Sequence, residues 1–184
     1  MTLTKTPICN FGEKAKNFKL LSTENTKVSL DDVKGKNGTL IMFICNHCPY
    51  VKAVIKEIVQ DVKFLESQGI KSAAIMSNDV KNYPEDSFEN MISFSKLHNF
   101  SFPYLIDDTQ KIAKDYDAVC TPDFFGYNKN LELQYRGRIR ELKDLKPVSK
   151  GDSDLRTAMK LVAKSEKGPK NQIPSMGCNI KWFK

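Results

Sequence analysis

Cysteines are the residues of this sequence whose type and position could do chemistry. Cys48 follows His47 and precedes Pro49, where an apolar strand ends and an amphipathic helix begins. The unpaired backbone N–H groups and the positive end of a helix stabilise a thiolate at that position. A thiol with a lowered pKa is a nucleophile or a redox centre. The sequence therefore predicts a reactive Cys48, with His47 and Lys52 adding positive charge, rather than a buried structural cysteine.

Cys45 precedes Cys48 by three residues, and this spacing offers an alternative interpretation as half of a zinc site. Tetrahedral zinc needs four ligands, which usually come from two such pairs. The sequence has no second pair, and His98 falls on a predicted helix. We therefore expect no metal at this motif.

Cys120, Thr121 and Pro122 form a second group of interest. The residue before a proline adopts extended geometry, and the bond to proline is the one that takes the cis form. The Thr121–Pro122 bond can therefore take the cis form. An ordinary loop proline before a strand is the alternative interpretation.

Hydrophobic periodicity predicts the elements that position these residues. Residues 39–44 are a continuous apolar run, as in a strand buried on both faces. Apolar side chains at 51, 54, 55, 58, 62 and 65 predict a helix from Pro49 to Gly69. Residues 70–76 are another apolar strand. These three elements predict a βαβ unit with parallel pairing and a right-handed crossover.

Shorter elements are predicted on both sides of this unit. The strands are expected at 17–21, 27–30, 102–106, 124–127 and 131–135. One helix is expected at 85–98, and a short one that begins at a cap on Asp108 or Thr109 and ends at 116. A last helix begins at a cap on Asp152 or Ser153. This order of strands and helices predicts the α/β class with a mixed central sheet. The sheet should have a parallel half that is followed by an antiparallel hairpin. We expect one domain over 1–184, with its core at about 12–165 and an irregular tail at 166–184.

The composition is that of a folded protein. The 184 residues are 40% hydrophobic and 28% charged, enough for one domain of ordinary size. The longest apolar run, 40–45, is too short to cross a bilayer, and the first twenty residues are too polar for a signal peptide. Five cysteines are an odd number, which argues against a secreted disulfide framework. We therefore expect a cytoplasmic protein with no membrane partner.

Positive charge gathers at the C-terminal end of the chain. The net charge is +7, and residues 140–184 carry 11 basic and 5 acidic side chains. A basic tail can attract nucleic acid or a membrane surface. This one lacks the Arg/Lys blocks and interleaved aromatic residues of a dedicated binder. We interpret it as a solvated surface and expect no nucleic-acid partner.

The motifs together resemble the thioredoxin fold, and in detail the peroxiredoxin-like branch of that superfamily, the alkyl hydroperoxide reductase/thiol-specific antioxidant type. The resemblance rests on residues 12–18, on Asn46-His47-Cys48-Pro49-Tyr50-Val51, on residues 120–124 and on the ending at 177–182. It implies a thioredoxin-like fold with an N-terminal β-hairpin extension and an inserted helix, and a redox site without a cofactor.

The resemblance also implies roles for residues. It puts Cys48 at the family's nucleophilic cysteine and Val51 at the usual resolving position, so the ordinary thioredoxin disulfide is not expected. Pro122 matches the family's cis-proline, whose loop faces the nucleophile. Cys120 thereby becomes the expected resolving thiol, with Cys45 second. The expected supporting residues are Asn46, His47, Pro49, Thr121 and Pro122.

Two departures from the family keep the reaction open. The buried acid that thioredoxins keep in the strand before the nucleophile is Met42 here. The peroxidatic cysteine of peroxiredoxins aligns with Val51. The roles of Cys9 and Cys178 also stay open.

Three functions follow from these residues. The favoured one is a thiol–disulfide oxidoreductase, in which Cys48 attacks a protein or small-molecule disulfide and a cellular dithiol restores the enzyme. The second is a peroxidase, in which a peroxide oxidises Cys48 to a sulfenic acid. The third is a binding module of the same fold that does no chemistry.

Overall fold

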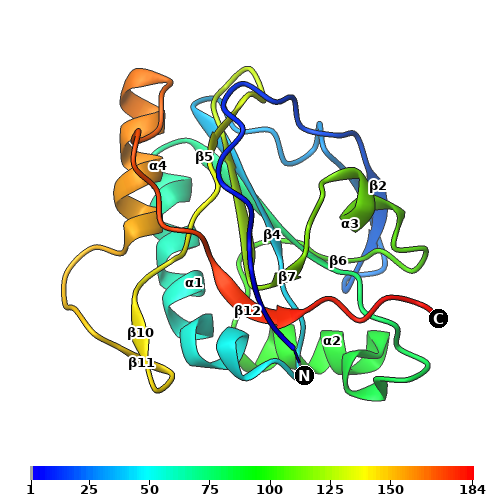
Figure 1. Ribbon diagram of the computed structural model, residues 1–184. Coiled ribbons are helices and arrows are strands. Elements are labelled where there is room, and N and C mark those ends of the chain that lie inside the picture. Colours follow the sequence, from blue (N-terminus) through cyan, green and yellow to red (C-terminus); the bar gives the residue numbers. More distant parts are fainter. Residues whose placement is uncertain (1) are drawn as a thin grey trace.

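The centre of the protein is a seven-stranded mixed sheet with helices on both faces (Figure 1). The computed structural model describes residues 2–184. In spatial order the strands are β3 (Lys27–Ser29), β2 (Lys19–Ser22), β6 (Tyr104–Ile106), β5 (Ile70–Met76), β4 (Gly38–Phe43), β8 (Asp123–Tyr127) and β9 (Leu133–Tyr135). Strands β6, β5 and β4 are parallel, and the outer pairs are antiparallel. The mixed sheet and the N-terminal hairpin predicted from the sequence are confirmed.

The helices cover the two faces of this sheet. They are α1 (Pro49–Ser67), the 3₁₀ helix η1 (Pro84–Asp86), α2 (Phe88–Leu97), α3 (Lys111–Asp115) and α4 (Asp154–Ser165). Helices α1 and α4 pack on one face and α3 on the other (Figure 1). None of the helices in residues 2–184 has both the length and the apolarity that a membrane span requires.

One predicted helix start is confirmed, and two others are corrected. Ser153 caps α4, and its hydroxyl accepts the N–H of Arg156, as predicted. Helix α2 starts after Ser87 rather than at residue 85, because residues 84–86 form the separate turn η1. The N-cap of α3 is Gln110, in a left-handed backbone conformation, and not Asp108 or Thr109.

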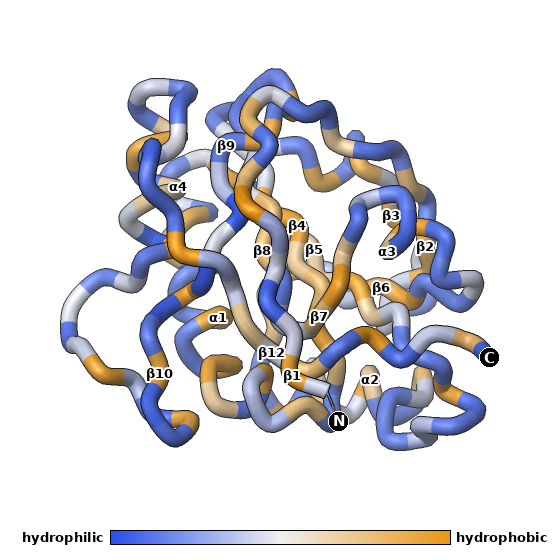
Figure 2. Tube along the Cα trace, in the orientation of Figure 1, coloured by the Kyte–Doolittle hydropathy of each residue, from blue (hydrophilic) through white to orange (hydrophobic). Residues whose placement is uncertain are grey.

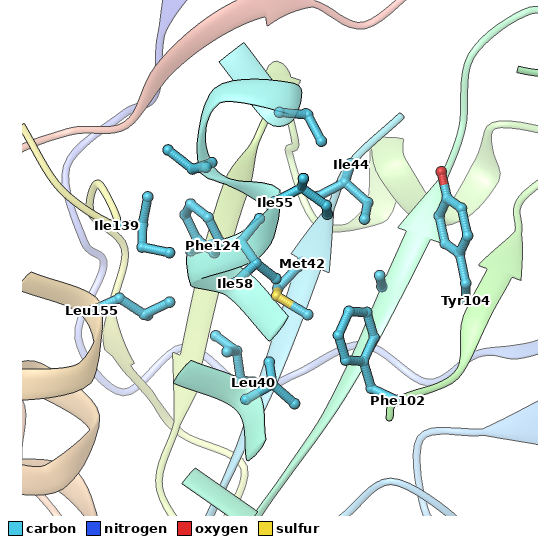
Figure 3. Packing of buried hydrophobic residues seen from close by; sticks show 14 of the residues in the cluster. Leu40, Met42, Ile44, Ile55, Ile58, Phe102, Tyr104, Phe124, Ile139 and Leu155 are labelled. Atoms are coloured by element: carbon cyan, nitrogen blue, oxygen red, sulfur yellow. The ribbon is translucent and has the colours of Figure 1, made fainter. Parts of the chain in front are cut away.

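The core consists of two hydrophobic clusters, one on each face of the sheet. Side chains of β4 alternate between them, with positions 40, 42 and 44 toward α1 and positions 41 and 43 toward α3. Figure 3 shows the first cluster, in which Met42 of β4 lies beside Ile58 of α1. Both side chains are fully buried, and each such burial stabilises the fold by about 1.5–3 kcal/mol. Figure 2 shows apolar residues along the central strands and polar residues on the outside of the molecule.

A second, three-stranded sheet joins the two ends of the chain to the loop that contains Pro122. It consists of β1 (Leu3–Lys5), β12 (Met176–Asn179) and β7 (Cys120–Thr121), all antiparallel (Figure 1). The prediction of an irregular tail is therefore wrong at 176–179. Without β12, backbone groups along one edge of β7 would have no hydrogen-bond partners, and β12 supplies them. A small hairpin of β10 (Leu142–Lys143) and β11 (Lys146–Pro147) was also not predicted.

Candidate active site

Cys48 is the N-cap residue of α1, as the sequence predicts. Its backbone is extended, and Pro49 opens the helix. The side chain is completely buried. The Thr121–Pro122 peptide bond is cis, also as predicted, and the carbonyl oxygen of Thr121 lies 3.2 Å from the Cys48 sulfur. The helix start and the cis-proline loop therefore meet at this thiol.

A sulfur of the C-terminal strand contacts Cys48. The Sγ atoms of Cys48 and Cys178 are 3.0 Å apart, although 130 residues separate them in sequence. A disulfide bond is ~2.05 Å long, so the two sulfurs are in contact but not bonded. All five cysteines are in the thiol or thiolate form. To form a disulfide, the two sulfurs need to move only a short distance toward each other.

The surroundings of Cys48 favour its thiolate. A hydrogen bond from Cys45 lowers the pKa of Cys48 most, and hydrogen bonds from Cys178 and the Val51 amide add to it. Together they outweigh burial and bring the pKa to about 5. Burial raises the pKa of Cys45 well above its usual range and that of Cys178 to about 12. Of the three thiols, Cys48 is therefore the first to ionise as pH rises.

Thr121 supports this arrangement from the cis-proline loop. Its hydroxyl oxygen lies 3.3 Å from the Cys45 sulfur, and this contact favours the charged form of Cys45 against the larger effect of burial. Cys45 is thus held between Thr121 and Cys48. The structure brings these three predicted site residues together.

Cys120 takes a different position from the one expected of a resolving thiol. In the β7–β12 ladder Thr121 lies opposite Cys178, and Cys120 lies opposite Asn179. Neighbouring residues of a strand point to opposite faces, so Cys120 points away from the face that carries Thr121 and Cys178. Its sulfur contacts the carbonyl oxygen of Pro122 at 3.8 Å, and burial raises its pKa. The sulfur in contact with Cys48 is therefore that of Cys178, and the assignment of Cys120 as the resolving thiol stays a prediction.

His47 forms an ion pair with a buried carboxylate. Its Nδ1 atom lies 2.6 Å from Oδ2 of Asp86 in η1, a side chain that is fully buried. The hydrogen bond to Asp86 raises the pKa of His47. Burial acts to raise the pKa of Asp86, but the hydrogen bonds from His47 and Asn78 outweigh it and lower that pKa. The ring of His47 stacks on Tyr83.

Asn46 anchors the loop before the nucleophile. Its backbone N–H donates to Oδ1 of Asp86 at 2.8 Å, and its side-chain oxygen accepts a hydrogen bond from the hydroxyl of Tyr104 at 2.9 Å. Its side-chain nitrogen donates to the carbonyl oxygen of Glu85. These bonds fix the approach to Cys48 on the β6 and η1 sides, which is the supporting role expected of Asn46.

Potential metal-ligand atoms of Cys45, His47 and Asp86 lie within 4.8 Å of one another. The chemistry of this donor set does not suit a metal. Oδ2 of Asp86 already accepts hydrogen bonds from His47 and Asn78, and Nδ1 of His47 is engaged in the first of them. We interpret the group as a hydrogen-bonded network.

Two hollows flank the site. An open groove of about 620 Å³ lies between the start of α1 and helix α2, and His47 and Lys52 line it. A hollow of about 300 Å³ lies on the other side, lined by Tyr50, Pro122 and residues 173–176 among others. A small substrate can therefore approach the helix start from two directions.

Sequence reasoning missed two residues of this site, Cys178 and Asp86. The ending at 177–182 was part of the family resemblance, and the odd cysteine count left one thiol to place. These were the signals for Cys178. Asp86 lies in a polar segment with several other acidic residues, and only the fold brings it 2.6 Å from His47.

Comparisons with known proteins agree with this geometry. The chain is 38% identical to an uncharacterized conserved protein from Geobacillus kaustophilus, whose crystal structure matches with a TM-score of 0.94 over 100% of this chain and 97% of that one. The thioredoxin domain of a thiol-disulfide oxidoreductase from Bacteroides vulgatus is 15% identical and matches with a TM-score of 0.58 over 68% and 86% of the two chains. The fold is thioredoxin-like.

Sequence comparison points to redox proteins. The thiol-disulfide oxidoreductase ResA of Bacillus subtilis (strain 168) is 26% identical over 117 residues, which are 64% of this chain and 61% of that protein's length. Residues 11–142 match the model of the AhpC/TSA family, a range that contains Cys45, Cys48 and the cis-proline loop. This chain belongs to the AhpC/TSA family.

Proposed function

We propose that this protein is a thiol–disulfide oxidoreductase in which Cys48 is the nucleophile and Cys178 the resolving thiol. One observation carries the proposal: the two sulfurs lie 3.0 Å apart at the start of α1. The difference between their pKa values, about 5 and about 12, gives them different roles. The thiolate attacks, and the thiol keeps its proton until the second step.

The reaction proceeds by two exchanges. The Cys48 thiolate attacks one sulfur of the substrate disulfide, forms a mixed disulfide and releases the first substrate thiol. Cys178 then loses its proton and attacks the Cys48 sulfur, which releases the second substrate thiol and leaves a Cys48–Cys178 disulfide. A cellular dithiol reduces this disulfide with two electrons. The substrate gains the two electrons that the cysteine pair loses.

Burial of Cys48 favours a second candidate, peroxide reduction. The side chain is 0% exposed beneath the cis-proline loop and β12, so these elements must move before any substrate reaches the sulfur. Hydrogen peroxide needs less movement than a protein disulfide, because it is far smaller. It would oxidise Cys48 to a sulfenic acid, and Cys178 would condense with that group, releasing water and forming the same disulfide.

Turnover measurements on one sample test the function. The wild-type protein, with a dithiol reductant, is assayed with 2-hydroxyethyl disulfide and with hydrogen peroxide. Cys48→Ser should abolish both activities. Cys178→Ser should stop each at a mixed disulfide or a sulfenic acid, whereas the control Cys120→Ser should turn over like wild type. Activity that survives Cys48→Ser would reject the proposal, and the preferred substrate decides between the two reactions.

We also propose that the protein works in the cytoplasm, as its cysteine usage suggests. A reduced dithiol pool is the donor that the cycle needs, and such pools keep cytosolic thiols reduced. Fractionation of cells with an antibody to the chain tests this proposal.

A further inference from the structure

One ring nitrogen beside the active site has no partner. His47 directs Nδ1 to Asp86 at 2.6 Å, while its Nε2 is buried and forms no hydrogen bond with residues 2–184. Buried polar atoms in folded proteins are almost always hydrogen-bonded, so an exception needs an explanation. A nitrogen that exchanges a proton with a transient partner is one such explanation.

Asp86 fixes the orientation of this ring. Its Oδ1 atom accepts the amide N–H groups of Asn46 at 2.8 Å and of His47 at 3.3 Å, and its Oδ2 accepts the side-chain nitrogen of Asn78 at 2.8 Å as well as His47. The carboxylate is completely buried and cannot rotate without breaking these bonds. It therefore holds Nδ1 as the donor and leaves Nε2 as the atom that can give or take a proton.

The proposed exchange reaction needs such a group. A thiolate leaving the substrate disulfide must gain a proton, and Cys178, whose pKa is about 12, must lose one. Met42 occupies the strand position where the family resemblance leads one to expect a buried acid. The ammonium of Lys181 is bonded to the backbone and side-chain oxygens of Asn179. His47 is adjacent to Cys48 and bears a titratable nitrogen without a partner.

We propose, on the basis of the function above, that His47 is the proton donor and acceptor of the Cys48 site and that Asp86 is its positioning residue. In the first exchange the imidazolium gives its Nε2 proton to the leaving thiolate. The neutral imidazole then takes the proton of Cys178, and returns it to the second leaving thiolate. Two protons, one from His47 and one from Cys178, thus end on the two product thiols, and reduction by the dithiol restores both.

The open groove between α1 and α2 gives this ring access to substrate. His47 lines the groove and 11% of its side chain is exposed, although Nε2 itself is buried, whereas Cys48 is fully buried. A leaving thiol that departs into the groove passes the imidazole. Asp86 does not contact the substrate itself, because its side chain is fully buried.

Other charged groups around His47 set the background for its titration. They are Cys45 and Cys48 from its own loop, Asp86 and Glu85 from η1, Lys52 from α1 and Lys181 from the C-terminal segment. Asp86 raises the pKa of His47 most, by its hydrogen bond, while burial and Lys181 oppose it. The neighbouring thiolate of Cys48 also favours the imidazolium.

Leaving-group dependence tests the proposal. The reduced protein reacts in single turnover at pH 7 with 2-hydroxyethyl disulfide, whose aliphatic thiolate needs a proton, and with 4,4′-dithiodipyridine, whose leaving group does not. Rates are corrected for the ionised fraction of Cys48, measured by thiolate ultraviolet absorbance. His47→Gln should slow the aliphatic disulfide by about 10²-fold and leave the pyridyl disulfide nearly unchanged.

Two further variants complete the design. Asp86→Asn keeps an oxygen acceptor for the two backbone amides but removes the charge. It should therefore slow the reaction with the aliphatic disulfide less than His47→Gln does, and again leave the pyridyl disulfide nearly unchanged. The control is Lys129→Gln, which changes a half-exposed side chain that lies in the turn after β8, outside the groove, and pairs with Glu166. It should behave like wild type with both reagents.

The outcomes separate this inference from the proposed function. Selective loss with the aliphatic disulfide in His47→Gln supports the proton-transfer role. Equal slowing of both disulfides, or of neither, would overturn it while Cys48 chemistry stands. Reaction of Cys48→Ser at the wild-type rate would instead reject the proposed function itself.

Discussion

The reactivity of Cys48 comes from neighbours that donate protons to it. Cys45 and Cys178 lie on different elements, and both remain thiols because burial raises their pKa values. Each can therefore stabilise the Cys48 thiolate with an S–H group. Hydrogen bonds to a charged acceptor are about twice as strong as neutral ones. Cys45 consequently contributes to the site even though Cys178 is the proposed partner in the disulfide.

Removal of Cys45 should raise the pKa of Cys48 without preventing disulfide formation. The Cys45 hydrogen bond is the largest cause of the low pKa, and a charge-assisted hydrogen bond of about 1.5–3 kcal/mol corresponds to roughly one to two pKa units. In the wild type, the iodoacetamide rate at Cys48 should rise with pH through about 5 and then level off. Cys45→Ala should move that midpoint upward, and mass spectrometry of the Cys48 peptide follows the reaction.

Cys45→Ser is the matched control, because the serine hydroxyl can still donate to the thiolate. Its midpoint should lie closer to that of wild type than the midpoint of Cys45→Ala. Identical midpoints in all three proteins would contradict the role of Cys45.

At the scale of elements, β12 covers the active site because it passes very close to β7. A Cβ atom at Gly177 would lie 2.0 Å from the carbonyl oxygen of Thr121, so only glycine fits this position. The close passage places Cys178 opposite Thr121 in the ladder. The position of the C-terminal strand therefore determines both the burial of Cys48 and its contact with Cys178.

Gly177→Ala should push β12 away from the cis-proline loop. Cys48 should then react faster with iodoacetamide at a pH where it is fully ionised, and the Cys48–Cys178 disulfide should form more slowly. Met176→Ala, in the same strand with a partly exposed side chain, is the control and should change neither rate appreciably. If Gly177→Ala left both rates as in wild type, β12 would not be the cover of the site.

The elements that carry long apolar patterns could be predicted from the sequence. Helix α1 and strands β4 and β5 each bury a continuous stripe or face, and their boundaries came close to those observed. Strand β12 has four residues, one of them glycine, and its structure depends on pairing with β7 and β1. Local patterns carry no signal for such pairing, which is why the position of Cys48 at the helix start could be predicted and its contact with Cys178 could not.

At the scale of the whole molecule, Arg136 ties distant segments together. Its guanidinium pairs with Asp123 of β8 at 3.0 Å and donates to the carbonyl oxygen of Asp117, and its amide N–H donates to Gln172. Asp123 directly follows the cis-proline and is fully buried, and burial raises its pKa to about 6 despite the nearby arginine. The site therefore depends on a buried ion pair that holds the cis-proline loop to the C-terminal segment.

Arg136→Met should lower the free energy of unfolding by about 3–5 kcal/mol at pH 7, because it leaves a buried carboxylate without its partner. A carboxyl pKa raised in the folded state stabilises the fold at low pH and loses that effect as pH rises through the folded pKa. Since the loss of Arg136 raises the pKa of Asp123 further, the deficit against wild type should be smaller at pH 5 than at pH 8. Urea denaturation at both pH values measures it.

The control for this prediction is Arg138→Met, because Arg138 pairs with Asp154 and Glu141 near the surface. Exposed pairs contribute about 0–1 kcal/mol, so the loss should be small and nearly independent of pH. A deficit in Arg136→Met as small as that of Arg138→Met would contradict the account of the buried pair.

The most direct test of the central claim is to identify the disulfide that forms on mild oxidation. The reduced protein is treated with a stoichiometric oxidant, alkylated, digested and mapped by mass spectrometry. The 3.0 Å contact predicts a link between the Cys48 and Cys178 peptides, formed equally well in Cys120→Ser and absent in Cys178→Ser. A Cys48–Cys120 or Cys45–Cys48 link, or no intramolecular link, would contradict the mechanism proposed for this site.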